Sequence, residues 1–275
     1  MKRFVVLIDN NPHPVLDLQT EHGLSFYFEI DDRKCLLDVG ASDKFISNAE
    51  KLGIAISEVD TLILSHSHAD HTGGLEAFLK ANSKAKVYLS ANILGEHYFS
   101  TRRGFKKDIS IDYSLFYKFQ DRFIRVTENI QISPSIEIIA DISTKYPRPI
   151  GNSTLMEGDK SDDFSHEIAL TLKDEDARVI VVSSCSHKGV LNTLEACACS
   201  NIKSYVGGMH LLDSDEKYQY ESQENLQTIL HTILFKYPGI KLLTGHCTGT
   251  AAKSYFKSEL ESRISLFYSG FEVKS

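Results

Sequence analysis

Three histidines and one aspartate stand within six consecutive positions, in the sequence His-Ser-His-Ala-Asp-His at residues 66–71. The motif follows an apolar run typical of a buried strand and precedes two glycines that open a helical pattern. Alternate side chains of an extended segment point the same way, so His66 and His68 can reach one cation together. The backbone has turned before Asp70 and His71, so these residues face a second position beside the first. Imidazole and carboxylate ligands suit Zn²⁺ and also Fe or Mn, and the motif therefore predicts a site for one or two divalent metal ions.

The elements that must position this motif can be read from apolar periodicity and turn residues. In the first half, β-branched and aromatic runs predict strands at 4–8, 24–30, 34–39, 59–65 and 87–90. Helical spacing predicts helices at 43–52 and from residue 75 onward. In the second half, strands are expected at 130–139, 168–173, 178–183, 202–206 and 240–244, and helices at 189–198, 223–235 and 250–261. This order of elements indicates an α/β protein with two sheets.

Three further histidines follow predicted strands of the second half. His187, His210 and His246 each lie just past the end of a strand. Functional residues concentrate in loops that a rigid scaffold positions, so three such coincidences favour a shared site over three structural roles. We therefore expect these histidines near the 66–71 motif.

The composition narrows the choice of partners and compartment. The chain has 275 residues, with 30 Lys and Arg against 37 Asp and Glu, and the net charge of −7 argues against a non-specific nucleic-acid binder. The N-terminal apolar run is too short for a signal peptide, and no apolar run reaches the roughly 20 residues that span a bilayer. Five scattered cysteines do not form a disulfide framework. We expect a cytoplasmic protein that binds a small molecule, with neither nucleic acid nor membrane as a partner; its oligomeric state stays open.

Residues 92–127 differ from the rest of the chain because they have no sustained period. They hold Arg102, Arg103, Lys106 and Lys107 among phenylalanine and tyrosine residues. We interpret the segment as an insertion or a lid. The basic cluster is either a solvated loop face or a phosphate clamp at the mouth of the site, since guanidinium and ammonium groups are the usual partners of phosphate.

Several motifs of the chain resemble those of the metallo-β-lactamase fold superfamily, whose signature is His-x-His-x-Asp-His. Besides 66–71, the resemblance rests on EHGLS (21–25), LLDVG (36–40), SSCSHKG (183–189), VGGMHL (206–211) and TGHCTG (244–249). Together they look like one branch, named after archaeal 7,8-dihydropterin-6-methyl-4-(β-D-ribofuranosyl)-aminobenzene-5′-phosphate synthase. Most members of that branch are called metal-dependent hydrolases. The resemblance implies a four-layer αββα sandwich with the metal ions at one edge between the sheets, and one domain over residues 1–275.

The resemblance also implies roles for individual residues. Asp38 matches an early structural aspartate, and His246 matches the last metal histidine. Cys185 stands where most members have the acidic residue that bridges two metals; a thiolate can bind zinc, but a small buried cysteine is an equal alternative. The first metal position is then His66 and His68, completed by either His187 or Asp162, and the second is Asp70, His71 and His246, with Cys185 as a further candidate.

Residues around the metal positions are candidates for contacts with the substrate. His210 is expected beside the substrate as a proton donor or phosphate contact, with a spare ligand or a supporting role as alternatives. Glu21 and His22, in the EHGLS motif, could line the site, although a turn before a strand is the plainer account of them.

Metal-assisted hydrolysis is the function that these features favour. A hydroxide held by the metal ions would attack a carbonyl or phosphorus of a small anionic substrate, with Asp70 orienting it and His210 protonating the leaving group. Three alternatives stay open: condensation of a pterin with a ribosylated aminobenzene phosphate, iron-dependent oxygen chemistry, and non-catalytic ligand binding by a protein that keeps its metal. Nucleic-acid processing is a fourth, which the acidic balance disfavours but the basic loop leaves open. Superfamily members cleave lactams, thioesters, lactones and phosphodiesters, so the fold does not identify the substrate.

Overall fold

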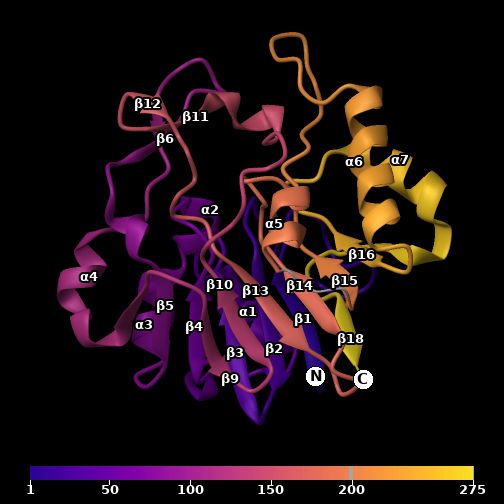
Figure 1. Cartoon of the computed structure of the whole chain (residues 1–275). Helices are drawn as coiled ribbons and strands as arrows, with labels where there is room; N and C mark the ends of the chain where they lie inside the picture. The colour runs from indigo at the N-terminus through magenta and orange to yellow at the C-terminus, as the bar shows by residue number, and fades with distance from the viewer. Residues whose placement is uncertain (198–200, 275) are drawn as a thin grey trace.

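Two seven-stranded sheets face each other in the computed structural model, which describes residues 1–197 and 201–274 (Figure 1). The first sheet has the order β18-β1-β2-β3-β4-β5-β8. Its strands are β1 (Arg3–Ile8), β2 (Ser25–Ile30), β3 (Arg33–Leu37), β4 (Thr61–Leu64), β5 (Lys86–Ser90), β8 (Phe123–Val126) and β18 (Glu272–Lys274). Strands β3, β4, β5 and β8 are parallel, and the other neighbours are antiparallel.

The second sheet repeats this plan. Its order is β17-β16-β15-β14-β13-β10-β9. The strands are β9 (Ile130–Ser133), β10 (Ile136–Ile139), β13 (Ala169–Lys173), β14 (Val179–Val182), β15 (Ile202–Val206), β16 (Lys241–Thr244) and β17 (Ile264–Leu266). Strands β14 to β17 are parallel and the rest antiparallel, so each sheet has one parallel half.

Helices cover the outer face of each sheet (Figure 1). Helices α1 (Lys44–Lys51), α3 (Leu75–Ala81) and α4 (Ser114–Lys118) place apolar residues against the first sheet, and the short helix α2 (Ala69–Thr72) carries part of the 66–71 motif. Helices α5 (Val190–Ala196), α6 (Gln223–Lys236) and α7 (Thr250–Leu260) do the same for the second sheet. Within the described residues, no helix is both long and apolar enough to cross a membrane.

Three hydrophobic cores separate the four layers. Side chains of a strand alternate between its two faces, and in β3 Leu36 packs toward the helices while Cys35 and Leu37 pack toward the other sheet. In β14, Val181 packs toward the helices, whereas its neighbours enter the core between the sheets. The αββα sandwich implied by the resemblance is therefore confirmed.

A third, four-stranded sheet of order β12-β11-β6-β7 was not expected from the sequence. It consists of β6 (Tyr98–Ser100), β7 (Lys107–Asp108), β11 (Leu155–Glu157) and β12 (Lys160–Ser161), and it lies at the upper left in Figure 1. The segment 92–127 contributes β6, β7, α4 and β8. That this segment is a lid, and that residues 1–275 form a single domain, both remain predictions.

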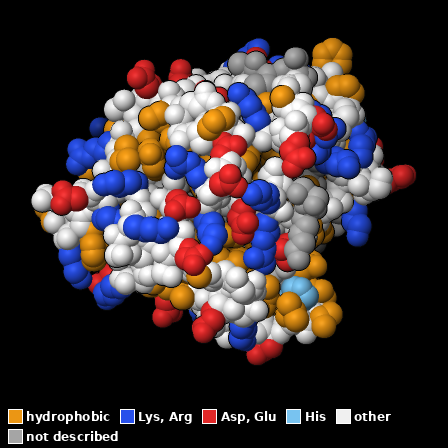
Figure 2. All heavy atoms as spheres, turned by 90° about the horizontal axis from the view of Figure 1, so that it is seen from below, with side chains coloured by type: hydrophobic (Ala, Val, Ile, Leu, Met, Phe, Trp, Pro, Cys, Tyr) orange, Lys and Arg blue, Asp and Glu red, His pale blue; other side chains and the backbone are white. Residues whose placement is uncertain are grey.

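The face at which both termini lie has mixed charge. Figure 2 shows this face, where Lys and Arg side chains stand among Asp and Glu side chains rather than in an area of their own. Charges of opposite sign at short range leave little long-range field, so this face offers no clear attraction to a charged ligand.

Candidate metal centre

The predicted site residues meet at one edge of the sandwich, where parallel strands of both sheets end. They come from the loops after β3, β4, β14, β15 and β16, and they are Asp38, His66, His68, Asp70, His71, Cys185, His187, His210 and His246. Carboxyl ends of parallel strands share one edge of a sheet, which is why sites form there. Asp38, His210 and His246 leave their strands with positive φ values of 62°, 49° and 48°, a backbone conformation that non-glycine residues adopt rarely and often at functional sites.

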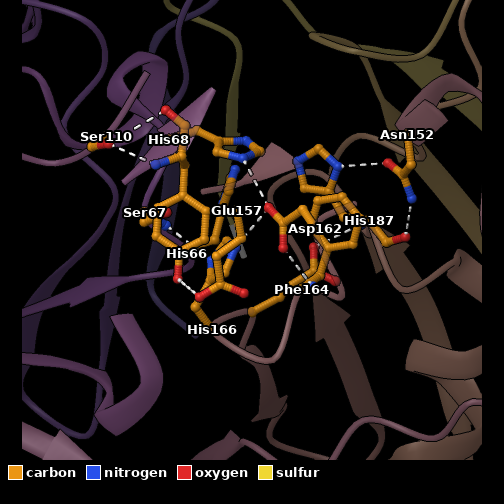
Figure 3. A network of polar contacts seen from close by, with 12 residues as sticks. His66, Ser67, His68, Ser110, Asn152, Glu157, Asp162, Phe164, His166 and His187 are labelled. Carbon is orange, nitrogen blue, oxygen red and sulfur yellow. Dashed lines mark hydrogen bonds and ion pairs between the residues drawn. The ribbon is translucent and has the colours of Figure 1, made fainter. Parts of the chain in front are cut away.

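His66, His68 and His187 form the first donor group. One ligand atom from each lies within 4.8 Å of the others, and all three side chains are buried. Figure 3 shows the imidazoles of His68 and His187 turned toward the same space. Among the described residues, the Nε2 atoms of His66 and His187 have no hydrogen-bond partner, and that of His68 has only Asp162 at 3.7 Å. Buried nitrogens without partners are costly, so this group fits a bound cation.

The protonation of this group also suits a metal. Burial lowers the pKa values of His66 and His187 well below their usual range, which keeps both rings neutral. Nδ1 of His187 lies 3.0 Å from Oδ1 of Asn152, whose amide nitrogen donates to the His187 carbonyl at 2.6 Å. Nδ1 of His187 therefore carries the proton, which leaves the lone pair of Nε2 for a ligand.

Asp162 belongs to a different hydrogen-bond arrangement. Its Oδ1 accepts from the amide of Phe164 at 2.7 Å, and its Oδ2 lies 3.1 Å from Nε2 of His166. The amide of Ser67 donates to Nδ1 of His166, so Nε2 of His166 is the donor to Asp162. Burial opposes ionisation of Asp162, but this hydrogen bond and the nearby His68 lower its pKa below the usual range. Of the two candidates for completing the first position, His187 has the nitrogen without a partner, whereas both oxygens of Asp162 are engaged.

Asp70, His71 and His246 form a second donor group beside the first. The Nε2 atoms of His71 and His246 lie 3.1 Å apart, and Oδ2 of Asp70 lies 3.5 and 3.4 Å from them. Ligand nitrogens of a tetrahedral zinc ion are about 3.4 Å apart, so these three atoms have separations that a single ion accommodates. Although burial raises the pKa of Asp70, the two imidazoles lower it well below its usual range. The residues at both positions thus fit divalent metal ions.

Residues behind the donors hold them in place. Buried Asp38 accepts hydrogen bonds from the amide and hydroxyl of Ser65, the hydroxyl of Ser184 and Nδ1 of His71, at 2.6–2.7 Å. It therefore connects the loops after β3, β4 and β14. Carboxylates that accept from ligand histidines orient the ring and fix its tautomer.

Three further supports were not identified from the sequence. Asp9 accepts from the amide of His246 at 3.0 Å, and Oδ1 of Asn10 lies 3.0 Å from the Nδ1 atom of the same histidine. Glu167 accepts from the amides of His187 and Lys188, and its burial raises its pKa to about 7. The one available signal was a polar Asp-Asn pair directly after the first predicted strand.

A cavity of about 1010 Å³ opens over the two positions. His210 lines it, and its buried Nδ1 has no partner among the described residues. Burial lowers the pKa of His210 to about 3, so its ring is neutral near pH 7. His22 also lines the cavity, with Nε2 3.4 Å from Oδ2 of Asp70.

The basic cluster divides between this cavity and the outer surface. Arg102, Arg103 and Lys107 line the cavity, together with Lys253, which was not expected. Lys106 instead pairs with Asp159 at 2.6 Å.

Glu21 serves the backbone rather than the cavity. Its carboxylate accepts from the amides of Ala41 and Ser42 and from the hydroxyl of Ser42. It fixes the turn after β3, a role that neither reading of the EHGLS motif predicted.

A four-layer sandwich with histidine and aspartate donors at the carboxyl edge of its sheets defines a protein of the metallo-β-lactamase fold. The sequence-family model of the metallo-beta-lactamase superfamily matches residues 19–166, and the chain belongs to that superfamily.

Individual relatives resemble the whole chain. It is 28% identical over 278 residues to 7,8-dihydropterin-6-methyl-4-(beta-D-ribofuranosyl)-aminobenzene-5'-phosphate synthase of Methanocaldococcus jannaschii, covering 93% of this chain and 90% of that protein. Among solved structures, Tm1679, a metal-dependent hydrolase of the beta-lactamase superfamily, matches with a TM-score of 0.81 and 26% identity, over 100% of this chain and 99% of that one. YhfI from Bacillus subtilis matches with a TM-score of 0.59 at 12% identity, over 99% and 98% of the two chains, which shows the fold alone.

Proposed function

We propose that the protein is a metal-dependent hydrolase that acts on a small, anionic, phosphate-bearing substrate in the cytoplasm. The observation that carries the proposal is the pair of adjacent donor groups, largely buried, beside a large cavity whose lining includes four basic side chains. Divalent ions held there, zinc in the first place and iron or manganese otherwise, would lower the pKa of water and polarise the bond to be cleaved.

The side chains around the ions have separate tasks in this proposal. His66, His68 and His187 would hold one ion, and His71 and His246, with Asp70 beside them, would hold the other. Asp70 lies between His71, His246 and the cavity, where its carboxylate can orient an attacking water molecule.

His210 contacts the substrate in this proposal. Its low pKa makes it a neutral hydrogen-bonding group near pH 7, so it positions or polarises a substrate oxygen more readily than it transfers a proton.

The basic rim supports an anionic substrate. Arg102, Arg103, Lys107 and Lys253 line the cavity, and charge-assisted hydrogen bonds from such groups are the strong contacts of phosphate. Three aspartates besides Asp70 also line the cavity, but each carboxylate has partners of its own: Asp108 pairs with His97, and Asp213 and Asp215 accept from backbone amides.

Metal content and hydrolysis measured on the same samples test the proposal. The purified protein is analysed for metals, stripped with a chelator and reloaded with one ion at a time, and each form is assayed against phosphodiesters, lactones and thioesters. We expect hydrolysis that disappears on stripping and returns with zinc. His68→Ala should lack both metal and activity, whereas His231→Ala, a change at an exposed position of α6, should keep both. Full activity after verified metal removal would refute the proposal.

A condensing synthase is the second candidate, because the Methanocaldococcus jannaschii relative is a synthase and matches nearly the whole chain. The metal-loaded protein would be incubated with a dihydropterin and a ribosylaminobenzene phosphate. A joined product detected by mass spectrometry, without hydrolysis of any substrate in the panel, would favour the synthase. Iron as the bound metal with oxygen consumption would favour oxygen chemistry, and a retained small molecule without turnover would favour a binding protein.

A further inference from the structure

Two cysteines lie in the metal centre rather than in the cores. Cys35 and Cys197 belong to hydrophobic cores, as buried cysteines usually do. Cys185 and Cys247 are equally buried, but they belong to none of the three cores and both line the cavity. The packing that explains the first pair therefore does not explain the second.

The sulfur atoms of this second pair face the proposed metal positions. Sγ of Cys185 lies 3.2 Å from Nε2 of His71. Ligand atoms of Cys185, His246 and Cys247 lie within 4.8 Å of one another, as do those of His66, His71 and Cys185. Cys185 thus lies between donors of both positions, whereas Cys247 lies beside the second alone. On a tetrahedral zinc ion, sulfur and nitrogen ligands are about 3.6 Å apart, so these separations suit a shared ion.

The backbone leaves room for the second sulfur. A Cβ atom on Gly208 would come within 2.4 Å of Sγ of Cys247 and 2.7 Å of the Ser184 carbonyl. Glycine at this position therefore lets the loop after β15 approach the thiol closely. Sγ of Cys247 lies 3.8 Å from the Cys185 carbonyl oxygen, and the thiol also interacts with the Cys185 side chain and the His210 backbone. The two sulfur atoms therefore lie close to each other beside the second position.

We propose that Cys185 and Cys247 are both thiolate ligands of the second metal position, with Cys185 placed between the two positions. Each thiol releases its proton to solvent as its sulfur forms a bond to the metal, and no oxidant or reductant takes part. Soft thiolate donors favour zinc or cadmium over magnesium or manganese, so the second position is selective for thiophilic ions. The inference rests on the proposed function only in requiring that metal binds.

Absorption spectroscopy separates sulfur ligands from nitrogen and oxygen ligands. The full-length, metal-free protein, kept reduced with a phosphine, is titrated with Co²⁺ or Cd²⁺, and thiolate-to-metal charge-transfer absorption in the near ultraviolet is followed with the number of ions bound. The variants are Cys185→Ser, Cys247→Ser, the double variant and Cys185→Asp, with Cys35→Ala as the control in a core. Thermal unfolding and circular dichroism establish that each variant is folded.

The expected pattern is specific. Charge-transfer absorption should fall to about half in each single serine variant, vanish in the double variant and remain in Cys35→Ala. The second ion should bind at least about 10-fold more weakly in each single serine variant, because loss of a residue that merely supports a ligand already costs about 10- to 100-fold. Cys185→Asp should restore binding of the second ion with reduced charge transfer, which also covers the case in which a serine variant fails to fold.

Two results would overturn the inference: two bound ions without charge-transfer absorption, or complete loss of the absorption in Cys185→Ser alone. These outcomes are distinct from failure of the proposed function. Charge-transfer absorption without hydrolysis would refute the proposed function and support the cysteine ligands. Hydrolysis without charge-transfer absorption would support the function and refute the cysteine ligands. Absence of any bound metal would refute both.

Discussion

The two halves of the chain contribute to the metal centre in opposite ways. In the first half a single loop after β4 supplies His66, His68, Asp70 and His71 within six residues. In the second half each loop supplies one or two donors, and strands β14, β15 and β16 must be aligned before those donors meet. The first half thus carries a local motif, whereas the second half carries a site that exists only in the folded sheet. The following changes test whether both kinds of contribution matter equally.

Removing one donor from each half gives the largest expected effect. His68→Ala and His187→Ala each delete a proposed ligand of the same position, so each should lower kcat/KM by at least about 1000-fold, which corresponds to roughly 4 kcal/mol of transition-state stabilisation. Metal analysis and steady-state kinetics on both variants check this. If His187→Ala retained metal and activity while Asp162→Ala lost them, Asp162 would be the third ligand of the first position. His187 would then not be a donor from the second half.

Breaking the connection between the halves should chiefly lower stability. Asp38→Asn keeps the size of the side chain and tolerates the positive φ of 62°, but it removes a buried charge that accepts from Ser65, His71 and Ser184. Loss of one partner in such a buried network costs about 3–5 kcal/mol of unfolding free energy, measured by urea denaturation. Asp17→Asn, at an exposed carboxylate paired with Lys51, should leave the unfolding curve unchanged. An equally stable Asp38→Asn protein would show that the network does not join the halves.

Crowding the loops of the second half should have a smaller effect. Gly208→Ala places a methyl group against Cys247 and the Ser184 carbonyl, and relief of such overlap costs about 1–3 kcal/mol. Gly239→Ala is a matched control because a Cβ there meets no atom within 4 Å. Thermal unfolding of both metal-free variants measures the difference. Equal melting temperatures would mean that the second half adjusts its loops freely.

The smallest expected effect concerns the basic rim. Arg102→Ala should raise KM for phosphate-bearing substrates about tenfold with little change in kcat, because Arg102 is exposed and its contact should lie at the weak end, about 1.5 kcal/mol, of the range for charge-assisted hydrogen bonds. Lys106→Ala is the matched control, since Lys106 is paired with Asp159 and does not line the cavity. Steady-state kinetics with a phosphorylated substrate and its dephosphorylated analogue separate the two. Equal effects of both variants would indicate a general influence of charge rather than a contact.

The same contrast explains what could be predicted from the sequence. Apolar periodicity located the strands before each donor loop. The contiguous motif predicted that His66 and His68 share one donor group, because alternate side chains of an extended segment point the same way. The histidines of the second half were placed correctly at strand ends.

Contacts between distant segments could not be predicted in this way. Asn10 reaches His246 only because the loops after β1 and β16 meet across the two sheets, and nothing in either local sequence records that. Lys106 pairs with Asp159, whereas adjacent Lys107, the first residue of β7, lines the cavity, and the sheet that contains β7 was not expected.

Strand β18 has a consequence for the order of folding. It pairs with β1 at the edge of the sheet built mainly by the first half, and Ser269 just before it donates from its amide to Asn11 and bonds through its hydroxyl with Asp9. Asp9 in turn holds the amide of His246. During synthesis the early strands emerge long before their last partner, so we expect the second metal position to become competent only after β17 and β18 have each joined its own sheet. In a chain shortened before Ile264, the first donor group would then bind its ion while the second would not, and counting the bound ions would detect this.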